Sequence, residues 1–287
     1  IVNQVKNVLI IFFVFLFSFN VISCSSKDSG SSSTSTASDD KTNVCSSSSI
    51  STRQLARSSN DYAYGVATDS SGNVYVAGGT YGGLDGNTNA GNSDLFVVKY
   101  NSSGTKQWTK QYGTEEYDEA RGVATDSSGN VYVTGGTKGR LNGISNSGRT
   151  DAFVIKFNSS GTKQWTKKLG TWQNDLANGV ATDSSGNFYV TGFTYQDMDG
   201  NTSAGNADLF VVKYNSSGTK QWTKQLGTSK HDRARGVVTD SSGNVYVTGD
   251  TYGGLDGNSK GNSDLFVVKY NSSGTKQWTK QYGTDRY

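Results

Sequence analysis

Short runs of β-branched and aromatic residues alternate with turn-forming residues along most of this chain. Between residues 122 and 170, such runs occupy positions 123–125, 131–134 and 151–157, and a polar amphipathic run occupies 163–169. The phrase Asp-Ser-Ser-Gly-Asn separates the first two runs and Asn-Ser-Ser-Gly-Thr the last two, and both compositions are typical of tight turns. The pattern predicts four antiparallel strands, with tight hairpins between the first and second and between the third and fourth.

This unit recurs four times at a period of 57 residues. The phrase Gly-Val-(Ala/Val)-Thr-Asp-Ser-Ser-Gly-Asn begins at Gly65, Gly122, Gly179 and Gly236. A Lys-Gln-Trp-Thr-Lys phrase follows each copy, and one residue is missing near Lys260 in the last. A fixed period of this size is typical of solenoids, propellers and arrays.

Four-stranded units favour propeller blades over a flat β-solenoid, whose coils are shorter and parallel. The first strand has small residues suited to a crowded axis, and the fourth carries the charges expected at an outer edge. We therefore predict an all-β chain, a β-propeller of four-stranded antiparallel blades. The blades are expected at about 61–112, 118–169, 175–226 and 232–282, within a repeat region that covers 51–287.

Both ends of the repeat region predict an incomplete, open ring. Residues 51–56 match the end of a fourth strand, so we expect an orphan outer strand there. Residues 283–287 begin a further repeat. The natural product is therefore expected to be longer and to have more blades.

The repeat phrases resemble a known family. Gly-Val-Ala-Thr-Asp-Ser-Ser-Gly-Asn-Val-Tyr-Val-Thr-Gly, followed by Asp-Leu-Phe-Val-Val-Lys-Tyr-Asn-Ser-Ser-Gly-Thr-Lys-Gln-Trp, is similar to the bacterial β-propeller repeats known as SBBP repeats. The first half of each unit is also similar to NHL-type propeller repeats. The resemblance implies a propeller in a secreted or cell-envelope protein, and it says little about activity.

The first 50 residues differ in character from the repeats. Residues 1–23 resemble a lipoprotein signal peptide, because an apolar core of about a dozen residues leads to Val-Ile-Ser before Cys24. An uncleaved anchor and an ordinary signal peptide are the alternatives. Residues 24–50 form a Ser/Thr-rich tract, which predicts a flexible tether. Lipidation of Cys24 would anchor the chain in the bacterial envelope, with the outer membrane favoured and the periplasmic or surface side left open.

Candidate binding residues lie where the four copies differ. The tight turns scarcely vary, whereas the loops between strands two and three and the linkers between blades do vary and share the opposite face. Variable loops on a fixed scaffold often bind ligands, although long loops also vary without a function. The candidates for contact with a protein or glycan are Trp172, Tyr117, His231, Arg140 and Tyr195.

A calcium site is the sharper alternative in the third copy. Asp197, Asp199 and Asn201 place oxygen atoms at alternate positions, and Asp208 follows at the twelfth position, as in a calcium loop. Thr202 stands where such a loop needs glycine. Gly83 and Gly254 replace Asp197 in the first and fourth copies, and Arg140 with Asn142 replaces both acids in the second. No other cofactor is indicated.

Catalysis and nucleic-acid binding have little support in the sequence. His231 occupies a position that varies among the copies, and no Ser/His/acid or Cys/His arrangement recurs. The net charge of +3 is dispersed, with no basic groove interleaved with aromatics. We therefore expect a non-enzymatic binding scaffold at the cell envelope. A calcium-stabilised surface repeat protein and a fragment of a propeller enzyme whose catalytic blades are missing are the alternatives.

Overall fold

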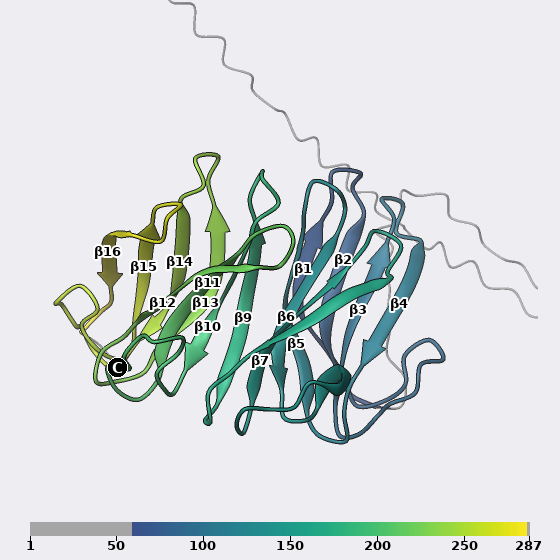
Figure 1. Ribbon diagram of the computed structural model, residues 1–287, viewed down its shortest axis with the longest axis horizontal. Helices are drawn as coiled ribbons and strands as arrows, with labels where there is room; N and C mark the ends of the chain where they lie inside the picture. The colour runs from purple at the N-terminus through teal and green to yellow at the C-terminus, as the bar shows by residue number, and fades with distance from the viewer. Residues whose placement is uncertain (1–58, 286–287) are drawn as a thin grey trace, which may run out of the picture. The chain divides into compact units, whose positions relative to one another are not determined.

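The computed structural model describes residues 59–285, which form four sheets of four antiparallel strands each (Figure 1). The strands of each sheet are hydrogen-bonded in chain order, so every sheet is a simple meander. The predicted all-β architecture of four-stranded propeller blades is confirmed. We call the sheets blades 1 to 4 in chain order.

The strands have closely similar lengths in all four blades. Their bounds are β1 Asp61–Thr68, β2 Val74–Thr80, β3 Asp94–Tyr100, β4 Lys106–Tyr112, β5 Asp118–Thr125, β6 Val131–Thr137, β7 Asp151–Phe157, β8 Lys163–Leu169, β9 Asp175–Thr182, β10 Phe188–Thr194, β11 Asp208–Tyr214, β12 Lys220–Leu226, β13 Asp232–Thr239, β14 Val245–Thr251, β15 Asp264–Tyr270 and β16 Lys276–Tyr282. A 3-10 turn, η1 Leu141–Gly143, interrupts the loop after β6. Within residues 59–285, no helix has the length and apolar character needed to cross a membrane.

Several predicted features lie outside the described residues. They are the signal peptide at 1–23, the tether at 24–50 with Cys24 and Cys45, the orphan strand at 51–56, and the last two residues of the further repeat.

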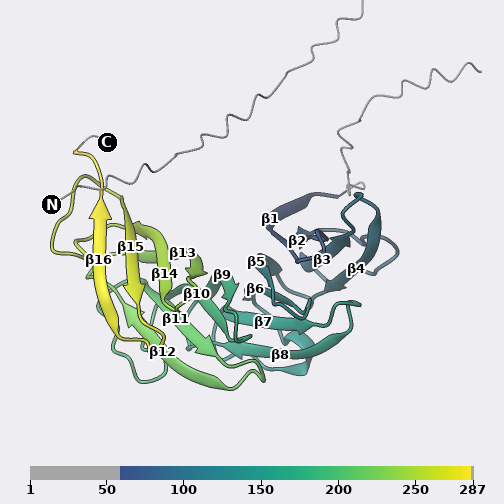
Figure 2. The same ribbon diagram turned by 90° about the horizontal axis from the view of Figure 1, so that it is seen from above.

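The blades follow one another in chain order. The first strand of each later blade, β5, β9 or β13, lies against the first two strands of the blade before it. Figure 2 shows the four blades along an arc, with β1 and β16 at its opposite ends. The described residues therefore form an open row of blades, as the sequence predicted.

The hydrophobic core is divided into layers between neighbouring blades. Leu95 and Val97 of blade 1 pack with Val133, Phe153 and Ile155 of blade 2, and all five side chains are fully buried. Equivalent layers join blade 2 to blade 3 and blade 3 to blade 4. The third strand is apolar on both faces because it contributes to the layer on each side of its blade. Each blade therefore depends on its neighbours for its stability.

Glycine allows the first strands to approach one another closely at the inner side of the blades. A Cβ atom added to Gly122 would lie 2.8 Å from the Thr134 hydroxyl and 3.2 Å from the Cα atom of Gly179 in the next blade. At the same repeat position, a Cβ atom on Gly236 would meet its nearest neighbour, Thr248, at 3.5 Å, which is ordinary van der Waals contact. The two positions share a sequence context, and only Gly122 has a following blade among residues 59–285.

We predict that Gly122→Ala destabilises the repeat region by about 1–3 kcal/mol, because the added methyl group overpacks the contact between blades. Gly236→Ala is the matched control, and we expect it to be neutral or to stabilise by up to about 1 kcal/mol through the unfolded state. Urea unfolding of both variants measures the difference. Equal effects of the two substitutions would show that close packing of neighbouring blades does not require the glycine.

A buried carboxylate fixes the start of the first strand in blade 2. The Oδ2 atom of Asp118 accepts hydrogen bonds from the backbone N–H and the hydroxyl of Thr114, each at 2.7 Å. The backbone N–H of Asp118 donates to the Ser93 carbonyl of blade 1 at 2.8 Å. Burial raises the pKa of the Asp118 carboxyl, against the lowering effect of hydrogen bonds from Thr137 and Thr114.

We predict that wild-type stability improves relative to Asp118→Asn as the pH falls from 7 toward 4. A raised folded-state pKa means that the folded chain binds the proton more tightly, so this group's contribution to stability is lost as the pH rises through that pKa. Denaturant titrations of both proteins across this range measure the difference in unfolding free energy.

Asp199→Asn provides a control of opposite sign. Burial raises the pKa of Asp199, but hydrogen bonds from Lys220 and Thr223 outweigh it and hold the pKa below its ordinary value. Wild type should therefore lose stability relative to Asp199→Asn as the pH falls. The same pH trend for both pairs would contradict the assignment.

Candidate binding face

The long loops and the linkers between blades meet on one face of the blade row, which we call the long-loop face. Isolated parallel bridges join each linker to the loop of the blade before it, between Ser93 and Tyr117, Thr150 and Asn174, and Ala207 and His231. The tight turns lie at the other ends of the strands. Antiparallel strands of equal length impose this alternation, so all the variable segments share a face.

The turns on the opposite face are constant for a structural reason. Oδ1 of Asp69 accepts hydrogen bonds from the N–H groups of Ser71 and Asn73, and Oδ2 accepts one from the Tyr75 hydroxyl at 2.9 Å. Gly72 has a φ of 75°, which favours glycine. The same contacts recur around Asp126, Asp183 and Asp240. Their invariance is explained by folding alone, which leaves the long-loop face as the candidate for recognition.

A row of mainly aromatic residues follows the linkers along the long-loop face. It combines the residue before each first strand with the residue after each second strand. We call it the aromatic row, and its members are Asn60, Tyr81, Tyr117, Lys138, Asn174, Tyr195, His231 and Tyr252.

Backbone hydrogen bonds place successive members of this row beside one another. The Lys138 and Tyr252 N–H groups donate to the carbonyls of Tyr117 and His231, at 3.0 and 2.9 Å. The rings then meet edge to face, with centroid distances of 6.4 Å for Tyr81–Tyr117 and 6.0 Å for Tyr195–His231. The Lys138 ammonium lies 4.8 Å from the Tyr117 ring centre. Such contacts hold the rings in fixed orientations.

A pocket of about 400 Å³ opens in the row between blades 2 and 3. Asn174 occupies the position that carries Tyr117 before blade 2 and His231 before blade 4. The shorter side chain leaves room beside Lys138 and Tyr195, both of which line the pocket. The linker residue at this internal contact is therefore smaller than Tyr117 and His231, while Asn60 before blade 1 has the same amide side chain.

The pocket combines apolar surface with hydrogen-bonding groups. Leu176 and Phe193 contribute apolar walls, and Arg121 and Glu119 contribute an ion pair at 3.2 Å. Arg121 is the extra residue of a β-bulge between Ala120 and Gly122, and a bulge changes the direction of its side chain. Convergent polar groups on an apolar wall are typical of small-ligand sites.

The structure brings together three of the five predicted binding residues. Tyr117 and Tyr195 line the pocket, and His231 follows Tyr195 in the aromatic row. Trp172 is 66% exposed and lines a separate hollow of about 770 Å³ between blades 2 and 3. Arg140 is exposed, and its Nε–H donates to the Gly143 carbonyl at 2.8 Å, away from the row.

The four predicted calcium ligands have separate protein partners. Asp199 pairs with Lys220 at 2.5 Å, and Asp197 accepts a hydrogen bond from the Ser203 N–H at 2.7 Å. Asp208 accepts hydrogen bonds from the Ala204 N–H and the Gln225 amide, whereas the Asn201 amide donates to the Met198 carbonyl. Between residues 59 and 285, no three His, Cys, Asp or Glu side chains are grouped to hold a metal ion. The alternation of acids in the sequence is therefore not matched by convergence in space.

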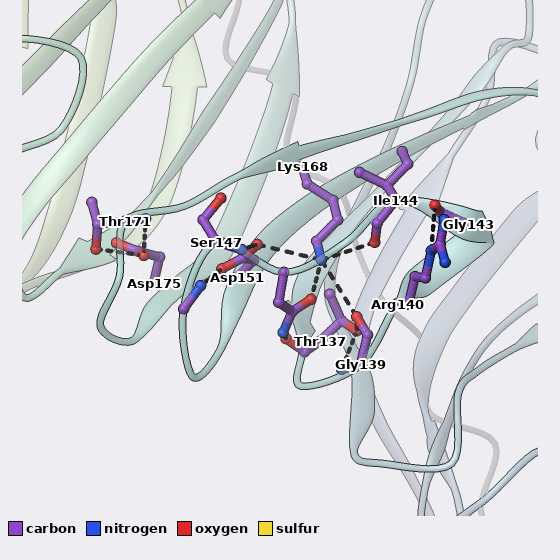
Figure 3. A network of polar contacts seen from close by, with 12 residues as sticks. Thr137, Gly139, Arg140, Gly143, Ile144, Ser147, Asp151, Lys168, Thr171 and Asp175 are labelled. Carbon is purple, nitrogen blue, oxygen red and sulfur yellow. Dashed lines mark hydrogen bonds and ion pairs between the residues drawn. The ribbon is translucent and has the colours of Figure 1, made fainter.

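Figure 3 shows the buried polar network that shapes the blade 2 loop beside the pocket. The Lys168 ammonium lies 3.3 Å from Oδ2 of Asp151, and both side chains are almost fully buried. It also donates to the Gly139 and Ile144 carbonyls and to the Asn146 side chain. Burial lowers the pKa of Lys168, against the raising effect of Asp151. These partners give the network a structural role in fixing the loop.

In the other blades, a glutamine takes the place of this lysine. Gln111 donates to Oδ2 of Asp94 and to the Gly82 carbonyl, at 2.9 and 3.0 Å. Lysine replaces glutamine in the blade whose loop between the second and third strands also differs in sequence.

Sequence reasoning missed Lys138, Arg121, Glu119 and Asn174 as site residues. A residue-by-residue comparison of the repeat position after the second strand would have paired Lys138 with Tyr81, Tyr195 and Tyr252. No sequence pattern indicated the pocket itself, because it lies where Asn174 has a shorter side chain than Tyr117 and His231.

Comparisons with known proteins identify the repeats. The sequence profile of the beta-propeller repeat SBBP matches residues 52–85, 107–142 and 221–256. Regulatory protein FlaEY of Caulobacter vibrioides is 29% identical over 196 residues, which cover 61% of this chain and 20% of that protein. An uncharacterized WD repeat-containing protein of Acanthamoeba polyphaga mimivirus is 27% identical over 229 residues, 61% of this chain and 16% of that protein. The chain spans a fifth or less of the length of these relatives.

Solved structures that match parts of the chain have low sequence identity to it and TM-scores below 0.5. The beta-propeller domain of the Trilobed protease from Pyrococcus furiosus, which has an open velcro topology, matches with a TM-score of 0.42 and 8% identity, over 78% of this chain and 58% of that one. A mutant of the Synechocystis apocarotenoid oxygenase matches with a TM-score of 0.42 and 13% identity, over 79% of this chain and 51% of that one. The SBBP beta-propeller repeat profile therefore matches three stretches of the chain, and residues 59–285 form four blades of the architecture that this repeat implies.

Proposed function

We propose that the chain is a non-enzymatic binding scaffold of the bacterial cell envelope and that its long-loop face binds a glycan. The observation that carries this proposal is the pocket of about 400 Å³ at Asn174 in the aromatic row. A volume of this size lies in the range of small-ligand sites. The pocket forms at Asn174, which belongs to a linker that varies between the repeats.

The chemistry of the pocket suits a sugar residue. The rings of Tyr117, Phe193 and Tyr195 offer apolar surfaces against which the flat face of a sugar ring can pack. Asn174 and Arg121 supply an amide and a guanidinium group for hydrogen bonds with hydroxyl groups. The neighbouring members of the row extend the surface toward blade 4, so an oligosaccharide has further contacts along it.

The charged side chains of the pocket already have protein partners, which supports a binding scaffold that needs no cofactor. Arg121 and Glu119 are paired with each other, and the Lys138 ammonium faces the Tyr117 ring. Such partners suit a site that holds a ligand by shape and hydrogen bonds, without a cofactor. Nucleic acid is disfavoured as the ligand by the small, dispersed net charge of +3.

The envelope location rests on the sequence. The apolar segment before Cys24 resembles a lipoprotein signal, and the Ser/Thr-rich stretch at 24–50 would separate the blades from the membrane. We propose that lipid on Cys24 anchors the chain and that the outer membrane is its destination. A scaffold held near the envelope is placed where glycans are abundant.

We predict that Asn174→Tyr weakens glycan binding by about tenfold or more, because a tyrosine ring would fill the pocket. Tyrosine is compatible with the repeat, since Tyr117 occupies the equivalent position. The measurement uses an array of neutral and acidic oligosaccharides, with the full chain purified in a mild detergent, followed by titration of each oligosaccharide bound.

Ser128→Tyr is the matched control, because it adds the same ring to an exposed tight turn on the opposite face. It should leave binding unchanged. Failure of the wild-type chain to bind any oligosaccharide would contradict the glycan ligand. Equal affinities of wild type and Asn174→Tyr would place the site elsewhere on the chain.

We predict that Cys24→Ser abolishes incorporation of radiolabelled palmitate and releases the chain from the membrane fraction. The thiol is the atom that a lipoprotein modification would acylate, and serine removes it. Cys45→Ser is the control, since Cys45 lies in the same tract and should not affect labelling. Labelling that persists in Cys24→Ser would rule out the proposed anchor.

A further inference from the structure

The linker between blades 2 and 3, residues 170–174, differs at two positions from the linkers before blades 2 and 4. Trp172 stands where those linkers have glutamate and serine, and Asn174 stands where they have tyrosine and histidine. The first difference adds a large ring to the linker, and the second removes one. Each residue lines a hollow, of about 400 Å³ at Asn174 and about 770 Å³ at Trp172. We call these the Asn174 pocket and the Trp172 hollow.

The two hollows lie toward opposite ends of this linker. Residues 167–169, at the end of the outer strand β8, line the Trp172 hollow. The Asn174 pocket is lined by Arg121 and Leu176, which belong to the first strands β5 and β9. Since β5 and β8 are the two edges of blade 2, the linker crosses the long-loop face between the two hollows.

The backbone that carries Trp172 is fixed, although its side chain is exposed. Oδ2 of the buried Asp175 accepts hydrogen bonds from the N–H and the hydroxyl of Thr171, at 2.6 and 2.9 Å (Figure 3). The same hydroxyl accepts a hydrogen bond from the Gln173 N–H at 3.3 Å. A Cβ atom added to Gly148 of blade 2 would lie 2.4 Å from the carbonyl carbon of Trp172. An exposed ring on a fixed backbone is preorganised for a ligand, because little conformational entropy is left to lose on binding.

The lining of the Trp172 hollow suits a sugar. Leu169 and Met198 contribute buried apolar side chains to its wall. Ser147 and Thr219 contribute hydroxyl groups, which both donate and accept hydrogen bonds. The indole ring offers a large apolar surface for the flat face of a sugar ring. The hollow therefore has the same combination of surfaces as the Asn174 pocket.

The charged groups of the Trp172 hollow balance one another. Lys168 and Lys220 are each paired with an aspartate, at 3.3 and 2.5 Å. Lys167 and Asp197 also line the hollow and have opposite charges. An acidic sugar would add a charge to a balanced set, so the lining favours a neutral ligand.

We propose that one neutral, linear oligosaccharide occupies both hollows, with an inner sugar at Asn174 and an outer sugar packed on the Trp172 ring. This inference rests on the proposed function and adds a requirement for chain length. A single sugar fills one hollow only, whereas a longer chain follows the linker to the second. The linkers before blades 2 and 4 have no tryptophan, so the extended site is specific to the junction between blades 2 and 3.

A size series of β-1,4-linked N-acetylglucosamine oligomers, from the monosaccharide to the hexasaccharide, tests the length requirement. The full chain in a mild detergent is titrated with each oligomer by calorimetry. Wild-type affinity should rise by about tenfold or more from the shortest oligomer bound to the longest, because only a long chain reaches the Trp172 ring.

Trp172→Ser removes the ring and introduces a residue that the repeat accepts, since Ser229 holds the equivalent position. It should lower the affinity for the longest oligomer by about tenfold and leave that for the shortest unchanged. Glu115→Ser is the matched control, because it makes the same residue at the equivalent position of the linker before blade 2. It should change neither affinity.

Fluorescence quenching by iodide reports directly on the outer sugar. Trp172 is 66% exposed, so its emission is accessible to the quencher. The longest oligomer should protect part of the wild-type emission from iodide, and the shortest should not. Trp172→Ser should show no such protection with either oligomer.

Three results would overturn the inference. Affinity that does not depend on length, or that Trp172→Ser leaves unchanged for the longest oligomer, would remove the outer sugar. An equal loss for short and long oligomers would place both residues at one sugar. A wild-type chain that binds no member of the series would contradict a neutral ligand. The effect of Asn174→Tyr on the oligosaccharide array, which includes acidic sugars, tests the proposed function separately, so the two failures are distinguishable.

Discussion

The packing of one blade on the next is the interaction on which the rest of this structure depends. A single four-stranded sheet of this sequence has apolar side chains on both faces of its third strand, and it can bury them only between two neighbours. Sequence repetition makes every such contact nearly the same, so stability is a sum over similar interfaces. The glycines of the first strands allow the blades to approach closely at the inner side, and buried aspartates such as Asp118 fix where those strands begin.

This constraint separates the two faces of the blade row by role. The tight turns must keep Asp and Gly at fixed positions to form their hydrogen bonds and positive φ angles, so they have little freedom to vary. The long-loop face has fewer such requirements beyond the bridges that hold each linker to a loop. Side chains vary there while the backbone bridges are retained, as at Tyr117, Asn174 and His231. The pocket lies at the smallest of these three side chains.

The fold could be predicted from the sequence because its turns, its strand patterns and its repeat period all indicate the same architecture. The turn phrases, the alternation of β-prone runs and the 57-residue period all specify four-stranded blades, and the structure confirms them. The sequence predicted only part of the candidate site. Tyr117, Tyr195 and His231 were identified because they vary between copies. Their common row was not, because it depends on backbone hydrogen bonds between a linker and a loop some 20 residues apart.

The calcium prediction illustrates the same limit. Asp197 and Asp199 alternate in the sequence as ligands would, yet the left-handed conformation of Asp199, with a φ of 51°, accompanies its pairing with Lys220 on a neighbouring strand. The sequence could not specify that pairing, which arises from where the fourth strand passes the loop. Calcium binding by these residues stays a prediction.

Photo-crosslinking in intact cells tests the central claim, that the long-loop face is the binding surface and the tight-turn face is structural. A diazirine-bearing residue is placed at Lys138 on the long-loop face in one strain and at Ser128 on the tight-turn face in another. The account predicts adducts with an envelope glycan from position 138 and none above background from position 128. Adducts that form equally from both positions, or from position 128 alone, would contradict it.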